Sequence, residues 1–149
     1  MLQVVLVLTA LDAVTKWWVE SDFIRGQSKA IVPGFLNFTL VYNRGAAFGQ
    51  GRQLPMVFFI VVSAIALGVV GYLYRRLKPE EGCSRWGLAL IFSGAVGNLI
   101  DRIRLGYVID FVDLYVGRYH WPAFNVADAC ITVGAVLFAL DLIRRPKGA

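Results

Sequence analysis

Four aspartates crowd into one short stretch of the chain and are the residues best suited to do chemistry. Asp101, Asp110, Asp113 and Asp128 lie within residues 97–128, between two apolar runs long enough to be membrane spans. An ionisable group near lipid costs about 2.5–3.5 kcal/mol on insertion scales, so such a group is expected to have a function. Two carboxylates held close together share a proton, and one can then act as a base toward water while the other acts as an acid. The pattern predicts hydrolytic chemistry by paired aspartates in a membrane.

The composition predicts a polytopic membrane protein with one domain, residues 1–149. Hydrophobic residues make up 58% of the chain and charged residues only 17%, and the mean hydropathy is +0.63. These values exclude an ordinary soluble core. The net charge of +5 comes from clusters beside apolar runs, where orientation in the bilayer explains them better than nucleic acid does. We expect no nucleic-acid partner.

The fold class that we expect is membrane all-α with a small β element. The apolar runs predict four transmembrane helices, at about 2–19, 55–74, 86–104 and 125–143, joined on the outer side by segments 21–52 and 105–124. Lys and Arg are densest at residues 75–85 and in the C-terminal tail, which predicts that both termini are cytoplasmic.

The two outer segments differ in pattern. Residues 35–43, FLNFTLVYN, alternate apolar and polar side chains and predict a strand. The sequence NRGAAFG that begins at Asn43 suits a tight turn, although a plain hairpin fits it too. Residues 105–124 are expected to form a polar loop with interfacial aromatic anchors.

Asp12 and Lys16 interrupt the first apolar run at a spacing of i, i+4. They share one face of a helix and can pair, with Lys16 reaching toward water beside Trp17 and Trp18. A purely structural ion pair explains them equally well.

The expected topology brings the acidic residues to one side of the membrane. The third helix ends and the fourth begins on the outer side, so all four aspartates and Asn43 belong to one leaflet. Asn98, Asp101 and Arg102 fall at i, i+3 and i+4 on one helix face and are expected to support the site.

Each aspartate also has a simpler explanation. Asn125 and Asp128 have the spacing of a helix N-cap, where an acid is favoured by the helix dipole. Asp110 and Asp113 can be solvated surface acids, and Asp101 can form a salt bridge to a neighbouring arginine, Arg102 or Arg104. The residues alone do not decide whether Asp101 or Asp110 is the partner of Asp128.

The remaining reactive side chains give weaker signals. Cys83 and Cys130 fall in a polar loop and in the last span, so we expect two free thiols. His120 can be an interfacial residue or a general base. No His or Cys spacing resembles a metal site, and we expect no metal. Small residues at 93–97 predict close helix packing.

Five motifs then occur in order along nearly the whole chain. They are DAVTK at 12–16, YNRGAAFG at 42–49, GNLIDR at 97–102, VIDF at 108–111 and FNVAD at 124–128. Together they resemble lipoprotein signal peptidase, the signal peptidase II family.

The resemblance implies an aspartic endopeptidase that cuts the signal peptide from prolipoproteins just before the lipidated cysteine. The family's catalytic pair falls on Asp110 and Asp128. Supporting and substrate-side residues, as carried over from the family, are Asn43, Asn98, Asp101, Arg102 and Asn125, with Asp12 and Lys16 structural or near the lipid. The resemblance also implies a small extracytoplasmic β-cradle, placed between the first and second helices.

The resemblance further implies partners and a location. The partners are a prolipoprotein with a diacylglyceryl cysteine, membrane lipid and a globomycin-type inhibitor, and no cofactor is required. The location is the bacterial inner membrane, with the active site on the extracytoplasmic side. Two rival functions are a proton-coupled carrier, which favours charge near the midplane of the membrane, and a scaffold, which would leave the five motifs as coincidence.

Overall fold

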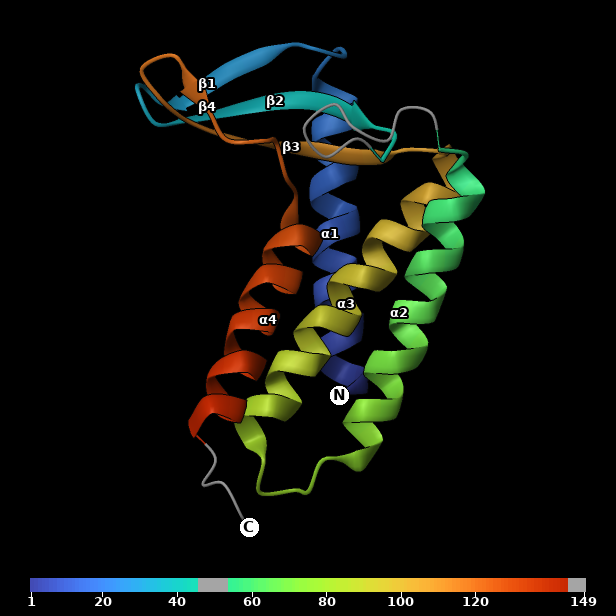
Figure 1. The fold of residues 1–149 in the computed structure, drawn as a ribbon. Coiled ribbons are helices and arrows are strands. Elements are labelled where there is room, and N and C mark those ends of the chain that lie inside the picture. The colour runs from blue at the N-terminus through green and yellow to red at the C-terminus, as the bar shows by residue number, and fades with distance from the viewer. Residues whose placement is uncertain (46–53, 145–149) are drawn as a thin grey trace.

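The computed structural model describes residues 1–45 and 54–144. In these ranges the chain forms four helices and four strands, arranged as in Figure 1: α1 (Leu2–Asp22), β1 (Ser28–Val32), β2 (Leu36–Asn43), α2 (Met56–Arg76), α3 (Gly82–Leu105), β3 (Val108–Val116), β4 (Tyr119–His120) and α4 (Val126–Arg144). The predicted fold class is confirmed. The turn expected at 43–49 lies partly outside the described residues, as does most of the basic tail.

The helices are apolar on the outside and polar within. All four are long and apolar enough to cross a membrane, and a helix satisfies its own backbone hydrogen bonds in lipid. Leu6, Phe58 and Ile65 are exposed, whereas Ser93 and Asn98 are buried. This distribution is typical of helices whose outer surface faces lipid and whose polar side chains face the protein interior.

The third helix begins earlier than predicted. It starts at Gly82 rather than near residue 86, so Cys83 lies in its first turn and not in a polar loop. Both cysteines are free, as predicted.

Helices α3 and α4 pack closely because glycines face each other across the contact. A Cβ atom added to Gly134 would lie 2.5 Å from the carbonyl oxygen of Gly87, and one added to Gly94 would collide with the carbonyl oxygen of Ala127. Close packing at the small residues near 93–97 was predicted, and Gly94 confirms it. This contact brings the start of α4 against α3.

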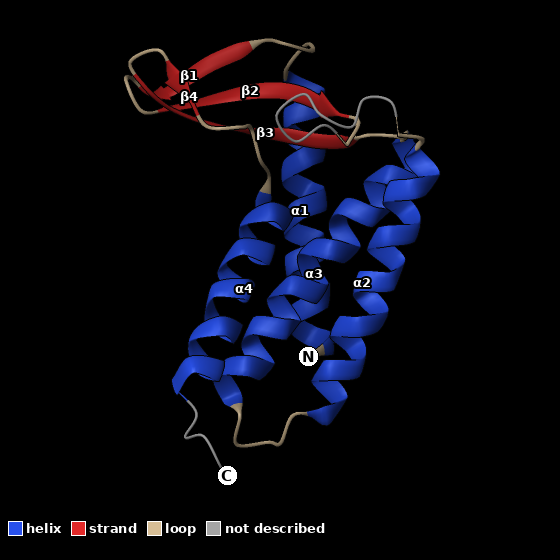
Figure 2. Cartoon of the chain, viewed as in Figure 1, coloured by secondary structure: helices blue, strands red, loops and turns tan. Residues whose placement is uncertain are grey.

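The small sheet lies across one end of the helices (Figure 2). Its strand order is β1-β2-β3-β4, and all neighbours are antiparallel. The strand predicted at residues 35–43 is β2. Two strands come from the loop between α1 and α2, and two come from the loop between α3 and α4.

The expectation that residues 105–124 form a loop is therefore wrong. The sheet expected between the first two helices is present, and this later segment adds two strands to it. β3 occupies the interior of the sheet, and its first four residues are all buried. A strand buried on both faces does not alternate apolar and polar residues, so it lacks the periodicity that revealed β2.

The sheet is fixed to the helices by an apolar cluster. Val19 and Phe23 at the end of α1 pack against Leu40 of β2 and against Ile109 and Phe111 of β3. This cluster holds the start of β3 above the helix bundle.

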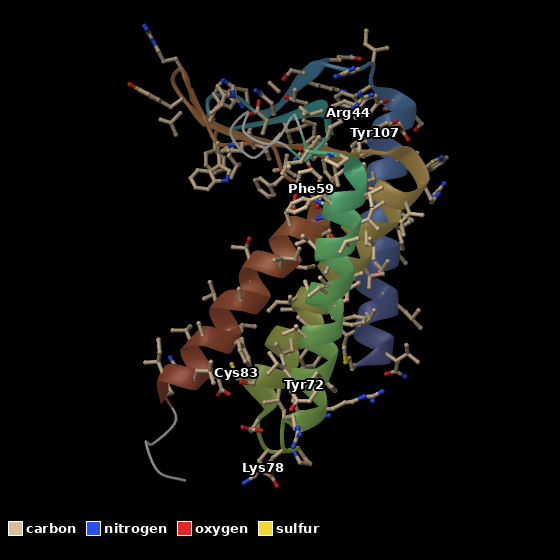
Figure 3. The ribbon with its side chains drawn as sticks, turned by 45° about the vertical axis from the view of Figure 1, so that its right-hand side comes forward. Arg44, Phe59, Tyr72, Lys78, Cys83 and Tyr107 are labelled. Atoms are coloured by element: carbon tan, nitrogen blue, oxygen red, sulfur yellow. The ribbon has the colours of Figure 1, made fainter. Side chains whose placement is uncertain are left out.

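Tyr107, one of the aromatic residues expected at the membrane interface, stacks on Tyr42 with ring centroids 4.3 Å apart. Figure 3 shows Tyr107 and Arg44 at the sheet end of the molecule, whereas Tyr72, Lys78 and Cys83 lie at the opposite end.

Substitution of Gly94 by Ala should lower stability because the new Cβ meets backbone of α4 that cannot move aside easily. We expect a loss of about 1–3 kcal/mol, seen as a lower midpoint of thermal unfolding in detergent. The matched control is Gly68→Ala on α2, where a Cβ meets nothing within 4 Å. If both variants unfold at the wild-type temperature, close α3–α4 packing does not limit stability.

Candidate active site

The structure brings the predicted site residues together at the sheet end of the bundle. They come from five elements and the loop before α4: Asp12 and Lys16 from α1, Asn43 from β2, Asn98, Asp101 and Arg102 from α3, Asp110 from β3, and Asn125 and Asp128 at the start of α4. Each is linked to at least one other member by a hydrogen bond, an ion pair or a close electrostatic interaction.

Asp110 is held by two asparagine side chains. Asn43 Nδ2 donates to Asp110 Oδ2 at 2.8 Å, and Asn125 Nδ2 donates to Asp110 Oδ1 at 2.8 Å. The register of β2 on β3 explains the first contact, because Asn43 is opposite Val108 and therefore diagonal to Asp110 on the same face. Asp110 is only 2% exposed.

Asp128 lies in the first turn of α4 and forms a capping box with Asn125. The Asn125 Oδ1 atom accepts a hydrogen bond from the Asp128 backbone N–H at 2.9 Å, and the Asn125 N–H donates to Asp128 Oδ2 at 3.3 Å. The predicted N-cap is therefore confirmed. Asn98 Nδ2 also donates to Asp128 Oδ1 at 2.8 Å. Asn125 thus contacts both Asp110 and Asp128.

The environment of Asp110 changes its acidity. Burial raises the pKa of Asp110 from 3.8 to about 7 and outweighs the hydrogen bond from Asn43, which lowers it. The negative charge of Asp128 raises this pKa further, while Lys16 and Asn125 lower it. Near neutral pH Asp110 can therefore both hold and release a proton.

Lys16 forms a buried ion cluster. Its Nζ atom lies 2.7 Å from Asp12 Oδ2 and 2.8 Å from Asp101 Oδ2, and it donates to Asn98 Oδ1 at 3.1 Å. The i, i+4 pair with Asp12 is confirmed. The expectation that Lys16 reaches water beside Trp17 and Trp18 is wrong, because Lys16 is 2% exposed and points toward α3.

The salt bridge proposed for Asp101 also has a different partner. Asp101 pairs with Lys16, not with Arg102 or Arg104. Arg102 instead donates from Nη1 to Ser63 Oγ of α2 at 3.3 Å. The Arg102 charge also interacts with Asp128, Asp110 and Asp101.

Asp113 lies outside this site. It has the opposite parity to Asp110 along β3 and contacts Asn37, Thr39 and His120, the last at 2.7 Å. Burial raises the pKa of Asp113, but the hydrogen bonds from these three residues outweigh burial and hold the pKa below its usual value. His120 therefore belongs to the Asp113 cluster. The hydrogen bonds described above for Asp110 and Asp128 do not include His120.

Two backbone groups complete the site and were missed from the sequence. The Ile109 N–H donates to Asp101 Oδ2 at 3.3 Å, and the Ala127 N–H donates to Asp12 Oδ1 at 2.9 Å. A backbone donor leaves no mark on residue type, so only knowledge of β3 and of the α1–α4 contact could have found them.

Within residues 1–45 and 54–144, no three His, Cys, Asp or Glu side chains are grouped as metal ligands would be. The site as described consists of carboxylates, amides, an ammonium group and a guanidinium group. Such groups can bind, polarise and protonate a peptide bond.

The fold and the site together define a multi-pass membrane protein that gathers buried carboxylates and amides at one end of its helices. Residues 4–144 match the sequence profile of the family described as signal peptidase (SPase) II. The chain belongs to this family.

Relatives and solved structures agree with this assignment. The chain is 48% identical over 148 residues to the lipoprotein signal peptidase of Geobacter sulfurreducens, covering 97% of this chain and 91% of the relative. It is 43% identical over 146 residues to that of Janthinobacterium sp. (strain Marseille), covering 93% and 85%. A solved bacterial membrane enzyme superposes with a TM-score of 0.88 at 31% identity, covering 99% of this chain and 93% of that one.

Replacement of Asp110 by Asn should change how stability depends on pH. The folded-state pKa of Asp110, about 7, lies above the ordinary value of 3.8. The contribution of Asp110 to the free energy of unfolding is therefore complete below pH 3.8 and is lost as the pH rises to 7. The loss is about 4 kcal/mol at most. The Asp110→Asn variant does not titrate, so its unfolding temperature in detergent should rise relative to wild type across this window.

The control for this measurement is Asp22→Asn, an exposed position at the end of α1. Parallel curves for wild type and Asp110→Asn between pH 4 and pH 8 would contradict a buried, proton-holding Asp110.

Proposed function

We propose that the protein is an aspartic endopeptidase that removes the signal peptide from diacylglyceryl-modified prolipoproteins and cuts just before the lipidated cysteine. The observation that carries the proposal is the sharing of Asn125 by Asp110 and Asp128, which ties two acidic side chains from β3 and α4 into one site. Membership of the signal peptidase II family supports the substrate class.

The two aspartates have different surroundings, and these suggest different roles. Asp110 is almost fully buried and holds a proton up to about pH 7, so it is the acid that protonates the carbonyl oxygen of the scissile bond. Asp128 is only partly buried and acts as the base that takes a proton from water.

The reaction then proceeds without a covalent enzyme intermediate. The water oxygen adds to the carbonyl carbon as Asp128 takes its proton and Asp110 gives one to the carbonyl oxygen. Collapse of the tetrahedral intermediate breaks the C–N bond, and the proton on Asp128 passes to the leaving amine. Asp110 regains its proton from the hydroxyl group of the intermediate. No cofactor is needed.

Supporting roles follow from the contacts. Asn43, Asn98 and Asn125 orient the two carboxylates by direct hydrogen bonds. Arg102 interacts electrostatically with both Asp110 and Asp128 and is proposed to stabilise the negative charge that develops on the substrate.

We propose that the chain acts as one domain in the bacterial inner membrane, with the site on the extracytoplasmic side. The loop between α2 and α3 lies at the end of the bundle opposite to the sheet (Figure 1), with the basic residues Arg75, Arg76, Lys78 and Arg85 in it and in the adjoining helix ends. Basic loops face the cytoplasm, which supports an outward-facing site and cytoplasmic termini. The partners proposed are the prolipoprotein, membrane lipid and a globomycin-type inhibitor.

The position of the charges also favours a peptidase over a proton-coupled carrier. Asp110 lies on the sheet and Asp128 at the start of α4, at one end of the helices. A carrier would be expected to have its ionisable residues near the middle of the membrane.

Replacement of Asp110 or Asp128 by Asn should abolish cleavage of a lipidated precursor, with a loss of at least about 1,000-fold, because either change removes proton transfer. Cleavage is measured by gel shift of the purified precursor, with and without globomycin. Asp113→Asn is the matched control, since Asp113 is on the same strand but contacts Asn37, Thr39 and His120 instead. Full activity of either active-site variant would refute the assignment.

The dependence of cleavage on pH should show a decline above about pH 7, where Asp110 loses its proton. The apparent value belongs to the pair of aspartates. Removal of one hydrogen bond to the Asp110 carboxylate, by Asn43→Ala, should move this decline to higher pH. A rate that stays level from pH 6 to pH 9 would mean that Asp110 is not the acid.

A further inference from the structure

Lys16 is at the centre of the polar interior of the protein. An ammonium group has three N–H donors, and Lys16 Nζ has three acceptors from two helices: Asp12 Oδ2, Asp101 Oδ2 and Asn98 Oδ1. The lysine is 2% exposed. Its donors are therefore fully used within the protein.

The two carboxylates that pair with Lys16 each hold a backbone group next to the proposed dyad. Asp101 Oδ2 accepts from the N–H of Ile109, the residue directly before Asp110. Asp12 Oδ1 accepts from the N–H of Ala127, the residue directly before Asp128. Lys16 is thus linked through Asp101 to the backbone beside Asp110 and through Asp12 to the backbone beside Asp128.

The third acceptor of Lys16 fixes the side chains of the same two aspartates. Asn98 Oδ1 accepts from Lys16 and also from Asn125 Nδ2. This orientation turns the Asn98 amide nitrogen toward Asp128, to which it donates at 2.8 Å. Asn125 in turn donates to Asp110.

We propose that Lys16 is a positioning residue for the reaction, which sets Asp110 and Asp128 relative to each other through Asp101, Asp12 and Asn98. The proposal rests on the assignment of these two aspartates as the catalytic pair. Lys16 does not touch the substrate. Its role is to keep β3, α3 and the start of α4 in the one arrangement in which both carboxyl groups meet the same peptide bond.

A purely stabilising ion pair is a weaker explanation for this cluster. Buried ion pairs are often replaced by apolar side chains with no loss of stability. The protein also leaves space for the cluster, because a Cβ at Gly97 would lie 2.5 Å from Asp12 Oδ2. Specific contacts that end beside both aspartates are what a positioning role requires.

A cavity of about 90 Å³ between α1 and α3 makes the proposal testable by chemical rescue. Asp12, Lys16 and Asp101 are among its polar lining residues, together with Glu20 and Arg104. Its apolar lining includes Ala13, Trp17 and Ile100. A Lys16→Ala variant lacks three carbons and the ammonium group, which together correspond to propylammonium. This cation is small enough to enter by the same cavity.

The experiment measures cleavage of a lipidated precursor by the full-length protein in detergent. Lys16→Ala should lower kcat by about 100-fold with KM unchanged, and propylamine should restore kcat. Neither propanol, which lacks the charge, nor tetramethylammonium chloride, which lacks N–H donors, should do so. Lys16→Met should lose the same activity without rescue, because its side chain fills the space. Lys78→Ala, at an exposed position, is the surface control.

The pH profile is a second readout, because it follows the charge of Lys16 at Asp110 and not the amount of folded protein. The charge of Lys16 lowers the pKa of Asp110, so the alkaline decline in rate should move to higher pH in Lys16→Met. The other groups that face Asp110 are retained in this variant; they are Asp128 from α4, Asn43 from β2, Asn125 from the loop before α4, and Arg102 from α3.

Wild-type kcat in Lys16→Met would overturn the proposal. A second pair of results would also overturn it: propylamine does not restore kcat in Lys16→Ala, and the alkaline decline in the rate of Lys16→Met lies at the wild-type pH. Together these results would indicate that Lys16 acts by packing alone. If Lys16→Ala and Lys16→Met do not fold without propylamine, Lys16→Arg, which keeps the charge in a larger group, is assayed instead, and wild-type kcat in folded Lys16→Arg would overturn the proposal. Asp110→Asn and Asp128→Asn are assayed in parallel; if they remain active, the catalytic assignment fails whatever Lys16 does.

Discussion

The ion cluster of Lys16 with Asp12 and Asp101 is the interaction on which the rest of the structure depends. Three charged groups buried among membrane helices are tolerable only when they are paired and hydrogen-bonded. The pairing joins α1 to α3, and the further hydrogen bonds of the two carboxylates extend it to β3 and α4. The glycine contacts between α3 and α4 let the helices approach closely enough for these bonds to form.

The same constraint gives two aspartates different properties. Asp110 lies on β3, where burial favours the protonated form, whereas Asp128 is in the first turn of α4 and is only partly buried. The different roles proposed for these two aspartates rest on this difference in surroundings.

Much of the fold could be predicted because lipid leaves few choices. About twenty apolar residues in a membrane form a helix, and β2 was visible because it has one apolar and one polar face. β3 could not be predicted, because its first four residues are buried on both faces of the sheet and show no alternation of apolar and polar residues. Without β3, the residue pattern alone could not separate Asp110, which faces the site, from Asp113, which faces Asn37 and His120. Only the resemblance to the family selected Asp110.

The direction in which the Lys16 side chain points could not be predicted from the neighbouring residues either. Spacing correctly paired it with Asp12, but a lysine beside Trp17 and Trp18 near a helix end ordinarily extends to water. Its actual position depends on Asp101 and Asn98, which are more than eighty residues away in the sequence. The family motifs identified the members of the site, and only the fold shows how they are connected.

The proposed mechanism requires that Asp110 holds a proton near neutral pH while Asp128 lies beside it. Infrared difference spectroscopy of the full-length protein in lipid, titrated from pH 5 to pH 9, measures this proton directly. We expect a protonated carboxyl band that disappears around pH 7 and is absent from Asp110→Asn. A band that is unchanged in Asp110→Asn, or no protonated carboxyl group at pH 5, would contradict it.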